Sequence, residues 1–255
     1  LAMALAVADN VTLEDLTLAH NSIMPKAALV LATCLATNST LVRIDVSGNT
    51  LGKLGGRAFI RTGIESRHME IGLAQTNLEV DDFSGEAFHP SRPSGSRTLD
   101  LSDPYSHAVA FELLRIFRDS QAVQLEPVTL AVPHSPAKTI TLRRSSIAGR
   151  PGRPPGAPPI IAVCSDEKPD EEWELPTMGT VTLSVSTSAD AVEPWRKAPN
   201  RAAKGMIRML KRKSLTSEER AVLVRLAADD MSLTGEQASS IVNESMAHLA
   251  GNPSV

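Results

Sequence analysis

The residue types that most often perform chemistry are few and widely spaced in this sequence. Six histidines are scattered along the chain, and the two cysteines, Cys34 and Cys164, lie far apart. Cysteines in this arrangement form neither a disulfide framework nor a zinc-binding motif. The sequence also lacks a glycine-rich phosphate loop between a strand and a helix. We therefore expect no catalytic residue, no cofactor and no metal, and we predict that the chain is not an enzyme.

One polar cluster near the C-terminus has the spacing with which a calcium-binding loop begins. Asp230, Ser232, Thr234 and Gly235 match the first, third, fifth and sixth positions of such a loop. The twelfth position is Ile241, where calcium requires a bidentate glutamate. Calcium binding is therefore the weaker interpretation of this segment.

A basic amphipathic segment extends from Arg201 to Lys213. Three interpretations are open: a solvated helix face, a contact with an acidic partner or a membrane surface, and a calmodulin-type target. Two serines, Ser145 and Ser214, follow basic residues as the substrates of basophilic kinases do. We predict phosphorylation at these serines as a separate hypothesis.

A spacing of apolar residues that recurs four times indicates which elements position the polar side chains. The spacing is L-x-x-L-x-L-x-x-N-x-L, and its copies begin at Leu13, Leu41, His68 and Ser96. Its central residues alternate as they do in a strand that is buried on one face. The asparagines at the corner position, Asn21 and Asn49, can bond the backbone of the turning chain. We predict one strand and one helix in each repeat.

This recurrence resembles the ribonuclease-inhibitor-like class of leucine-rich repeats. The stretches Leu35-Ala-Thr-Asn38 and Val7-Ala-Asp-Asn10 precede equivalent strands and add to the resemblance. At the corner position Thr76 and Pro104 replace asparagine, so the last two repeats depart from the pattern. The chain begins in the middle of a repeat, and we expect it to be a fragment of a longer protein.

The resemblance implies an α/β fold, a leucine-rich-repeat solenoid with a curved parallel sheet and outer helices. We expect this solenoid over residues 1–124. A β-rich module over 125–190 is predicted from strands at 128–132, 139–142, 160–163 and 181–185, with a proline-rich linker and P-x-x-P pairs at 149–159. A helical unit over 199–250 follows, with capping boxes at Thr216 and Thr234 that start two of its helices.

Residues between the buried strand positions are expected to project together from the concave face of the sheet. Acids outnumber bases among them, which suits a protein partner with a basic surface. We therefore predict a protein–protein interaction scaffold, and the alternative is a regulator of an enzyme, such as a GTPase-activating protein of the same repeat class. The candidate binding residues are Glu14, Asp15, Thr17, His20, Arg43, Asp45, Glu70, Gln75, Arg97 and Asp100.

The composition of the chain argues against some classes of partner and favours one cellular compartment. The chain carries 26 basic and 29 acidic residues, for a net charge of −3, which is not the charge pattern of a nucleic-acid-binding protein. Its apolar runs are shorter than the roughly 20 residues that a membrane span needs. We expect a cytoplasmic protein, with cytoskeletal assemblies among the settings that the resemblance implies, and no transmembrane segment.

Overall fold

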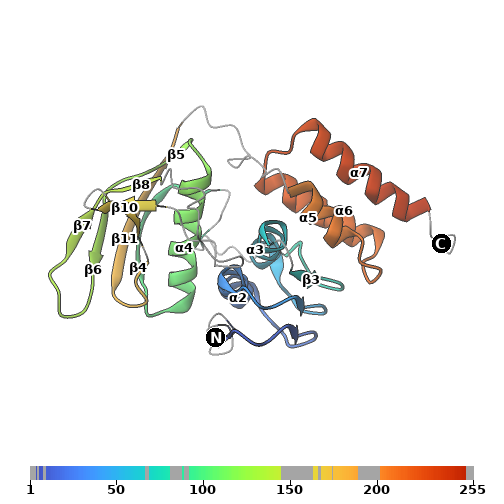
Figure 1. Cartoon of the computed structure of the whole chain (residues 1–255), viewed down its shortest axis with the longest axis horizontal. Coiled ribbons are helices and arrows are strands. Elements are labelled where there is room, and N and C mark those ends of the chain that lie inside the picture. Colours follow the sequence, from blue (N-terminus) through green and yellow to red (C-terminus); the bar gives the residue numbers. More distant parts are fainter. Residues whose placement is uncertain are drawn as a thin grey trace. The chain divides into compact units, whose positions relative to one another are not determined.

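The computed structural model describes residues 4, 6–7, 10–66, 69–80, 88, 92–144, 163–165, 168–173, 175–188 and 202–250 (Figure 1). The chain forms two compact units: residues 1–82 together with 197–255, and residues 83–196. The predicted proline-rich linker at 149–159, Ser145 and most of the strand predicted at 160–163 lie outside the described residues.

A three-stranded parallel sheet, in the order β1-β2-β3, is the centre of the first unit. Leu16 pairs with Ile44, and Ile44 pairs with Ile71, as the repeated spacing predicts. Helices follow the first two strands, and α2 and α3 pack against each other. These elements are β1 (Asp15–Thr17), α2 (Pro25–Thr37), β2 (Arg43–Asp45), α3 (Gly52–Glu65) and β3 (Glu70–Gly72).

Buried asparagines tie neighbouring turns together. The Asn49 side chain is 2% exposed, and its Nδ2 donates to the carbonyl oxygens of Leu18 and Val46 at 2.9 and 2.7 Å. Its Oδ1 accepts from the backbone N–H groups of Asn21 and Ile23, both at 2.9 Å. One amide thus satisfies buried polar groups of two successive turns, which confirms the structural role predicted for Asn49.

The other repeated asparagines act in related ways. Asn38 Nδ2 donates to the carbonyl oxygens of Val7 and Asn10 at 2.7 and 2.9 Å, which links the chain across one period. At the third corner, Thr76 Oγ1 donates to Leu73 O at 2.6 Å. This hydrogen bond corresponds to the one from Asn49 Nδ2 to Val46 O, three residues earlier in the chain. It stays within one turn and does not link two successive turns.

The C-terminal helices belong to the same compact unit as this sheet. Helix α5 packs on α3 and on β3, α6 packs on α3, and α7 packs on α5 (Figure 1). The buried apolar side chains of this layer include Met206, Met209, Leu210, Leu223, Leu226 and Ile241. The helices are α5 (Ala202–Leu210), α6 (Ser217–Asp230) and α7 (Gly235–Ala250).

Glycines bring α3 and α5 close together. A Cβ atom at Gly205 would lie 2.8 Å from Ile64 Cα, and one at Gly63 would lie 2.8 Å from Met209 Sδ. The atom facing Gly205 belongs to the backbone, so α5 could not pack this closely on α3 with a larger residue at that position. The atom facing Gly63 belongs to a flexible methionine side chain, which could shift.

The second unit is built on a five-stranded, antiparallel sheet in the order β4-β11-β6-β7, with β5 also paired to β11. Alternate residues of β11, Val181, Leu183 and Val185, are buried, and α4 packs on β4, β5 and β11. A smaller sheet has the order β10-β9-β8. The elements are β4 (Gly95–Asp100), α4 (Pro104–Asp119), β5 (Val123–Leu125), β6 (Val128–Ala131), β7 (Lys138–Ile140), β8 (Leu142–Arg144), β9 (Val163–Ser165), β10 (Lys168–Glu172) and β11 (Thr180–Thr187).

The predicted leucine-rich-repeat solenoid is wrong as the fold of this chain. The fourth stretch does not extend the parallel sheet, because β4 pairs antiparallel with β11 and Leu99 lies opposite Val181. Alternating leucines fit any strand buried on one face and do not set the direction of its neighbour. At the corner stands Pro104, which begins α4 and has no amide to bond an adjacent turn.

The compact units also divide the chain differently from the expected domains. The boundary expected at residue 124 does not separate units, because residues 83–196 cluster together. The helical unit expected over 199–250 packs within the first unit instead of standing alone. Sequence periodicity identifies helices and strands along the chain, but it does not indicate which of them pack together when they are distant in the sequence.

The Asn49 amide is expected to be a major source of stability in the first unit. Asn49→Ala should lower the free energy of unfolding of this unit by at least about 2 kcal/mol, because it leaves several buried backbone groups unpaired. Asn21→Ala is the matched control, since the Asn21 side chain is exposed and bonds only Ala19 O among its described contacts.

Urea unfolding followed by circular dichroism measures this change. Both tryptophans, Trp173 and Trp195, lie within residues 83–196, so tryptophan fluorescence reports on the second unit in the same sample. Equal unfolding curves for Asn49→Ala and Asn21→Ala would contradict the role given to Asn49.

Candidate functional site

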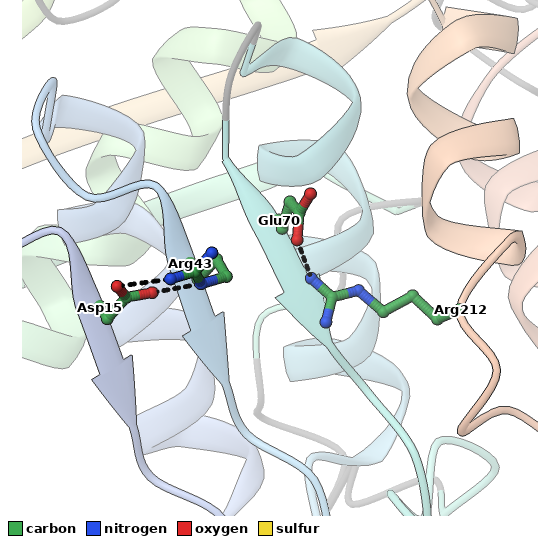
Figure 2. A network of polar contacts seen from close by, with 4 residues as sticks. All are labelled: Asp15, Arg43, Glu70 and Arg212. Carbon is green, nitrogen blue, oxygen red and sulfur yellow. Dashed lines mark hydrogen bonds and ion pairs between the residues drawn. The ribbon is translucent and has the colours of Figure 1, made fainter.

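The exposed side of the parallel sheet collects most of the predicted binding residues. We call it the strand face: the side of β1, β2 and β3 opposite Leu16, which is half-buried, and Ile44 and Ile71, which are buried, with the helices behind it (Figure 2). Alternation along each strand places every second side chain on this face. Its residues are Asp15, Thr17, Arg43 and Glu70, which are exposed, and Asp45, which is half-buried. Glu14 is exposed just before β1, and its charge also acts on Arg43.

An ion pair joins the first two strands on this face. Arg43 donates from both Nε and Nη2 to the two carboxylate oxygens of Asp15, and the Nη2–Oδ2 distance is 2.7 Å (Figure 2). The side chains are 59% and 53% exposed, so water and salt screen the pair strongly. The hydrogen bond that Arg43 donates to Asp15, followed by the charge of Asp15, raises the pKa of Arg43. Asp15 therefore does not present an uncompensated negative charge.

A second ion pair joins β3 to the C-terminal helices. Arg212, just after α5, donates from Nη2 to Glu70 Oε2 at 3.0 Å (Figure 2). Arg220 of α6 fixes the turn that carries Arg212, because it donates to Leu210 O at 2.9 Å and to Arg212 O at 3.0 Å. The strand face thus continues from three strands of the N-terminal part onto a turn more than a hundred residues later.

Helix α6 also fixes Gln75, through a hydrogen bond to its backbone. Its N–H donates to the carboxylate of Glu219, and its own φ is 55°. Glu219 also accepts from Thr216 N–H at 2.7 Å, while Thr216 Oγ1 accepts from Glu219 N–H at 3.2 Å, which confirms the predicted capping box of α6. Burial alone would raise the pKa of Glu219, but the N–H groups of Thr216 and Gln75 oppose it and the pKa is lowered.

His20 and Asp45 lie against glycines at the ends of the strands. A Cβ atom at Gly48 would come within 2.2 Å of His20 Nδ1, and one at Gly72 within 2.5 Å of Asp45 Oδ1. Asp45 Oδ1 also accepts from Ser47 N–H at 3.0 Å. The glycines make room for these side chains, and His20 remains exposed beside the strand face.

Two predicted site residues, Arg97 and Asp100, are not part of the strand face. Both are in β4 of the second unit, because this strand joins the antiparallel sheet. Arg97 Nη1 donates to Pro93 O at 2.8 Å, and Asp100 Oδ1 accepts from Ser102 N–H at 2.9 Å. Asp103, three residues after Asp100, caps α4 by accepting from Ser106 N–H at 2.9 Å. These contacts belong to local turns and a helix cap.

A basic depression beside β3 is the feature that the candidate list from the sequence omitted. It has a volume of about 660 Å³ and shares Glu70 with the strand face. The signal was the basic segment ending at Lys213, but nothing in the spacing indicated that this segment lies against β3. The depression is lined by Glu70, Lys204, Ile207, Arg208, Lys211, Arg212, Lys213 and Ser214.

The described residues offer little support for a catalytic or metal site. Within them, no group of three or more His, Cys, Asp or Glu side chains could hold a metal ion. The alternative of a GTPase-activating protein requires an Arg or Asn on a loop after a strand. Asn49 occupies such a position, but its amide is buried and bonded to backbone groups on both sides.

The described helices also include none that is long and apolar enough to cross a membrane.

Comparisons with protein-family models, curated proteins and solved structures gave no match for this chain. The strand face and the basic depression are therefore interpreted from their own geometry.

The contact of α6 with Gln75, in the loop after β3, is expected to weaken in acid. The pKa of Glu219 is lowered in the folded chain, so its contribution to stability is present above its unfolded pKa of about 4.3 and is lost as the pH falls through the folded pKa. Glu219→Ala should cost about 1 kcal/mol at pH 7 and should remove this part of the acid sensitivity.

The capping box of α7 supplies the matched control. Gln237 accepts from Thr234 N–H at 2.9 Å without a charge, so Gln237→Ala should destabilise the chain equally at pH 7 and pH 4. The measurement is urea unfolding of the three proteins at both pH values. The account of Glu219 fails if Glu219→Ala remains as acid-sensitive as the wild type.

Proposed function

We propose that this chain is a non-enzymatic protein-binding module that holds a partner protein on the strand face. The observation that carries this proposal is the row formed by the ion pairs Asp15–Arg43 and Glu70–Arg212, which crosses three parallel strands and a distant turn (Figure 2). Asp15, Arg43 and Glu70 are exposed, Arg212 is half-buried, and the opposite side of the sheet is packed. The proposed compartment is the cytoplasm, on the strength of the sequence composition alone.

The rigidity of the underlying sheet supports this use of the face. Each strand is fixed in register by backbone pairing, and the turns that follow are held by Asn49 and by Glu219. Exposed side chains on such a support lose less conformational freedom on binding than side chains on a mobile loop would. A partner would therefore meet a surface that is largely formed in advance.

The charges of the face favour a partner of mixed polarity over a uniformly basic one. Asp15 is bonded to Arg43 and Glu70 to Arg212, so two of the acids that suggested a basic partner are compensated. Exposed pairs of this kind contribute more to specificity and association rate than to affinity. Charged side chains of a partner can form new ion pairs with these residues, so that binding leaves no buried charge unpaired.

Thr17 provides a direct test because it is exposed on the strand face, in β1 and two residues after Asp15. Thr17→Arg should leave the fold intact and should reduce capture of specific partner proteins at least about tenfold, since a long cationic side chain would separate the partner from the sheet. Quantitative mass spectrometry of proteins captured by the immobilised chain measures this effect.

Thr139→Arg is the control, because Thr139 is an exposed strand residue of β7 in the second unit. Both variants add one arginine to a strand, so their non-specific charge effects match. If Thr17→Arg captures the same proteins in the same amounts as the wild type and Thr139→Arg, the strand face is not the binding surface.

A further inference from the structure

The cationic side chains of the basic depression are not all engaged by the fold. Arg208 Nη2 donates to the carbonyl oxygens of Gly63 and Ser66 at 3.0 and 2.8 Å, where it caps the end of α3. Lys211 Nζ lies 3.0 Å from Glu244 Oε1, and Arg212 pairs with Glu70. These three cationic side chains are therefore already bonded to groups of the first unit.

The other two cations of the depression are exposed and make no described contact. Lys204, on α5, and Lys213, in the turn after it, have no ion-pair or hydrogen-bond partner among the residues that the structure describes. Ser214 adds an exposed hydroxyl beside Lys213. The lining therefore offers two cations and a hydroxyl to an anion from outside, with Ile207 as an apolar contact between them.

The lining has an elongated shape set by the helix. Lys204, Ile207 and Arg208 of α5, and Lys211 just after it, follow one another at helical spacing along one stripe. The stripe from Lys204 to Lys211 is about 10 Å long at about 1.5 Å per residue. Lys213 follows two residues beyond Lys211 in the turn after α5. An extended peptide covers about 10 Å with about three residues, so an acidic segment of several residues can follow the stripe from Lys204 toward Lys213.

We propose that the basic depression binds an extended acidic peptide segment of a partner protein, with its carboxylates at Lys204 and Lys213 and an aliphatic side chain at Ile207. The inference concerns a site next to the strand face and does not depend on the proposed function of that face. Glu70 lies in the lining, and a peptide can place a neutral residue opposite it.

Other anionic partners fit these features less well. A nucleic acid carries a charge on every phosphate and gains affinity by stacking bases on aromatic rings, and no aromatic residue lines the depression. A membrane surface attracts cations that project from a helix surface together with apolar residues that enter the lipid. Here the cations surround a hollow, and the apolar residue in the lining, Ile207, is half-buried.

The test is fluorescence anisotropy with a labelled octapeptide of alternating glutamate and leucine, titrated with the full chain. The control peptide has the same sequence with glutamine in place of every glutamate. The double variant Lys204→Gln/Lys213→Gln is compared with Lys26→Gln/Arg92→Gln, which removes the same charge from exposed positions elsewhere.

The wild type and the control variant should bind the glutamate peptide at least about tenfold more tightly than the glutamine peptide, and the Lys204/Lys213 variant should lose about tenfold in affinity. Thr17→Arg should bind the peptide normally, which separates this site from the strand face. The proposal is overturned if the glutamate peptide does not bind, if both double variants bind it equally, or if a 20-nucleotide single strand or phosphatidylserine vesicles bind more tightly through the same two lysines.

Discussion

The close approach of α3 and α5 at Gly63 and Gly205 is the contact on which the first unit depends. A parallel sheet of three strands leaves its last strand, β3, and the last helix packed behind it without a neighbour. In many folds the next repeat would cover that apolar flank. Here the chain leaves after β3, forms a second compact unit, and returns at α5 to cover the flank with Met206, Met209 and Leu210.

The charge pattern of the surface follows from this return. Because α5 packs on β3, the turn after it brings Arg212 to Glu70, and α6 brings Glu219 to the backbone of Gln75. The same packing turns the basic side of α5 outward beside the strand face, where it forms the depression. Two surfaces of different charge thus adjoin at Glu70: a row of compensated ion pairs and a cationic hollow.

Local features could be predicted from the sequence because they depend on neighbours in the chain. The register of Leu16 with Ile44 and Ile71 and the role of Asn49 follow from spacing, since a corner amide satisfies backbone groups within its reach. The direction of β4 could not be predicted, because Leu99 carries the same alternating pattern in either orientation. Pairing of Arg212 with Glu70 depends on helix packing across the whole unit, and no periodicity encodes it.

The most direct measurement is hydrogen exchange of the full chain with and without Gly205→Val, which places methyl groups where α5 meets Ile64. If α5 closes the sheet, amides of β3 and α3 should exchange faster together with those of α5 and α6, while amides of β6 and β11 should not change. Unchanged exchange in β3 and α3, alongside faster exchange in α5, would show that the sheet is stable without its C-terminal helices and would contradict this account.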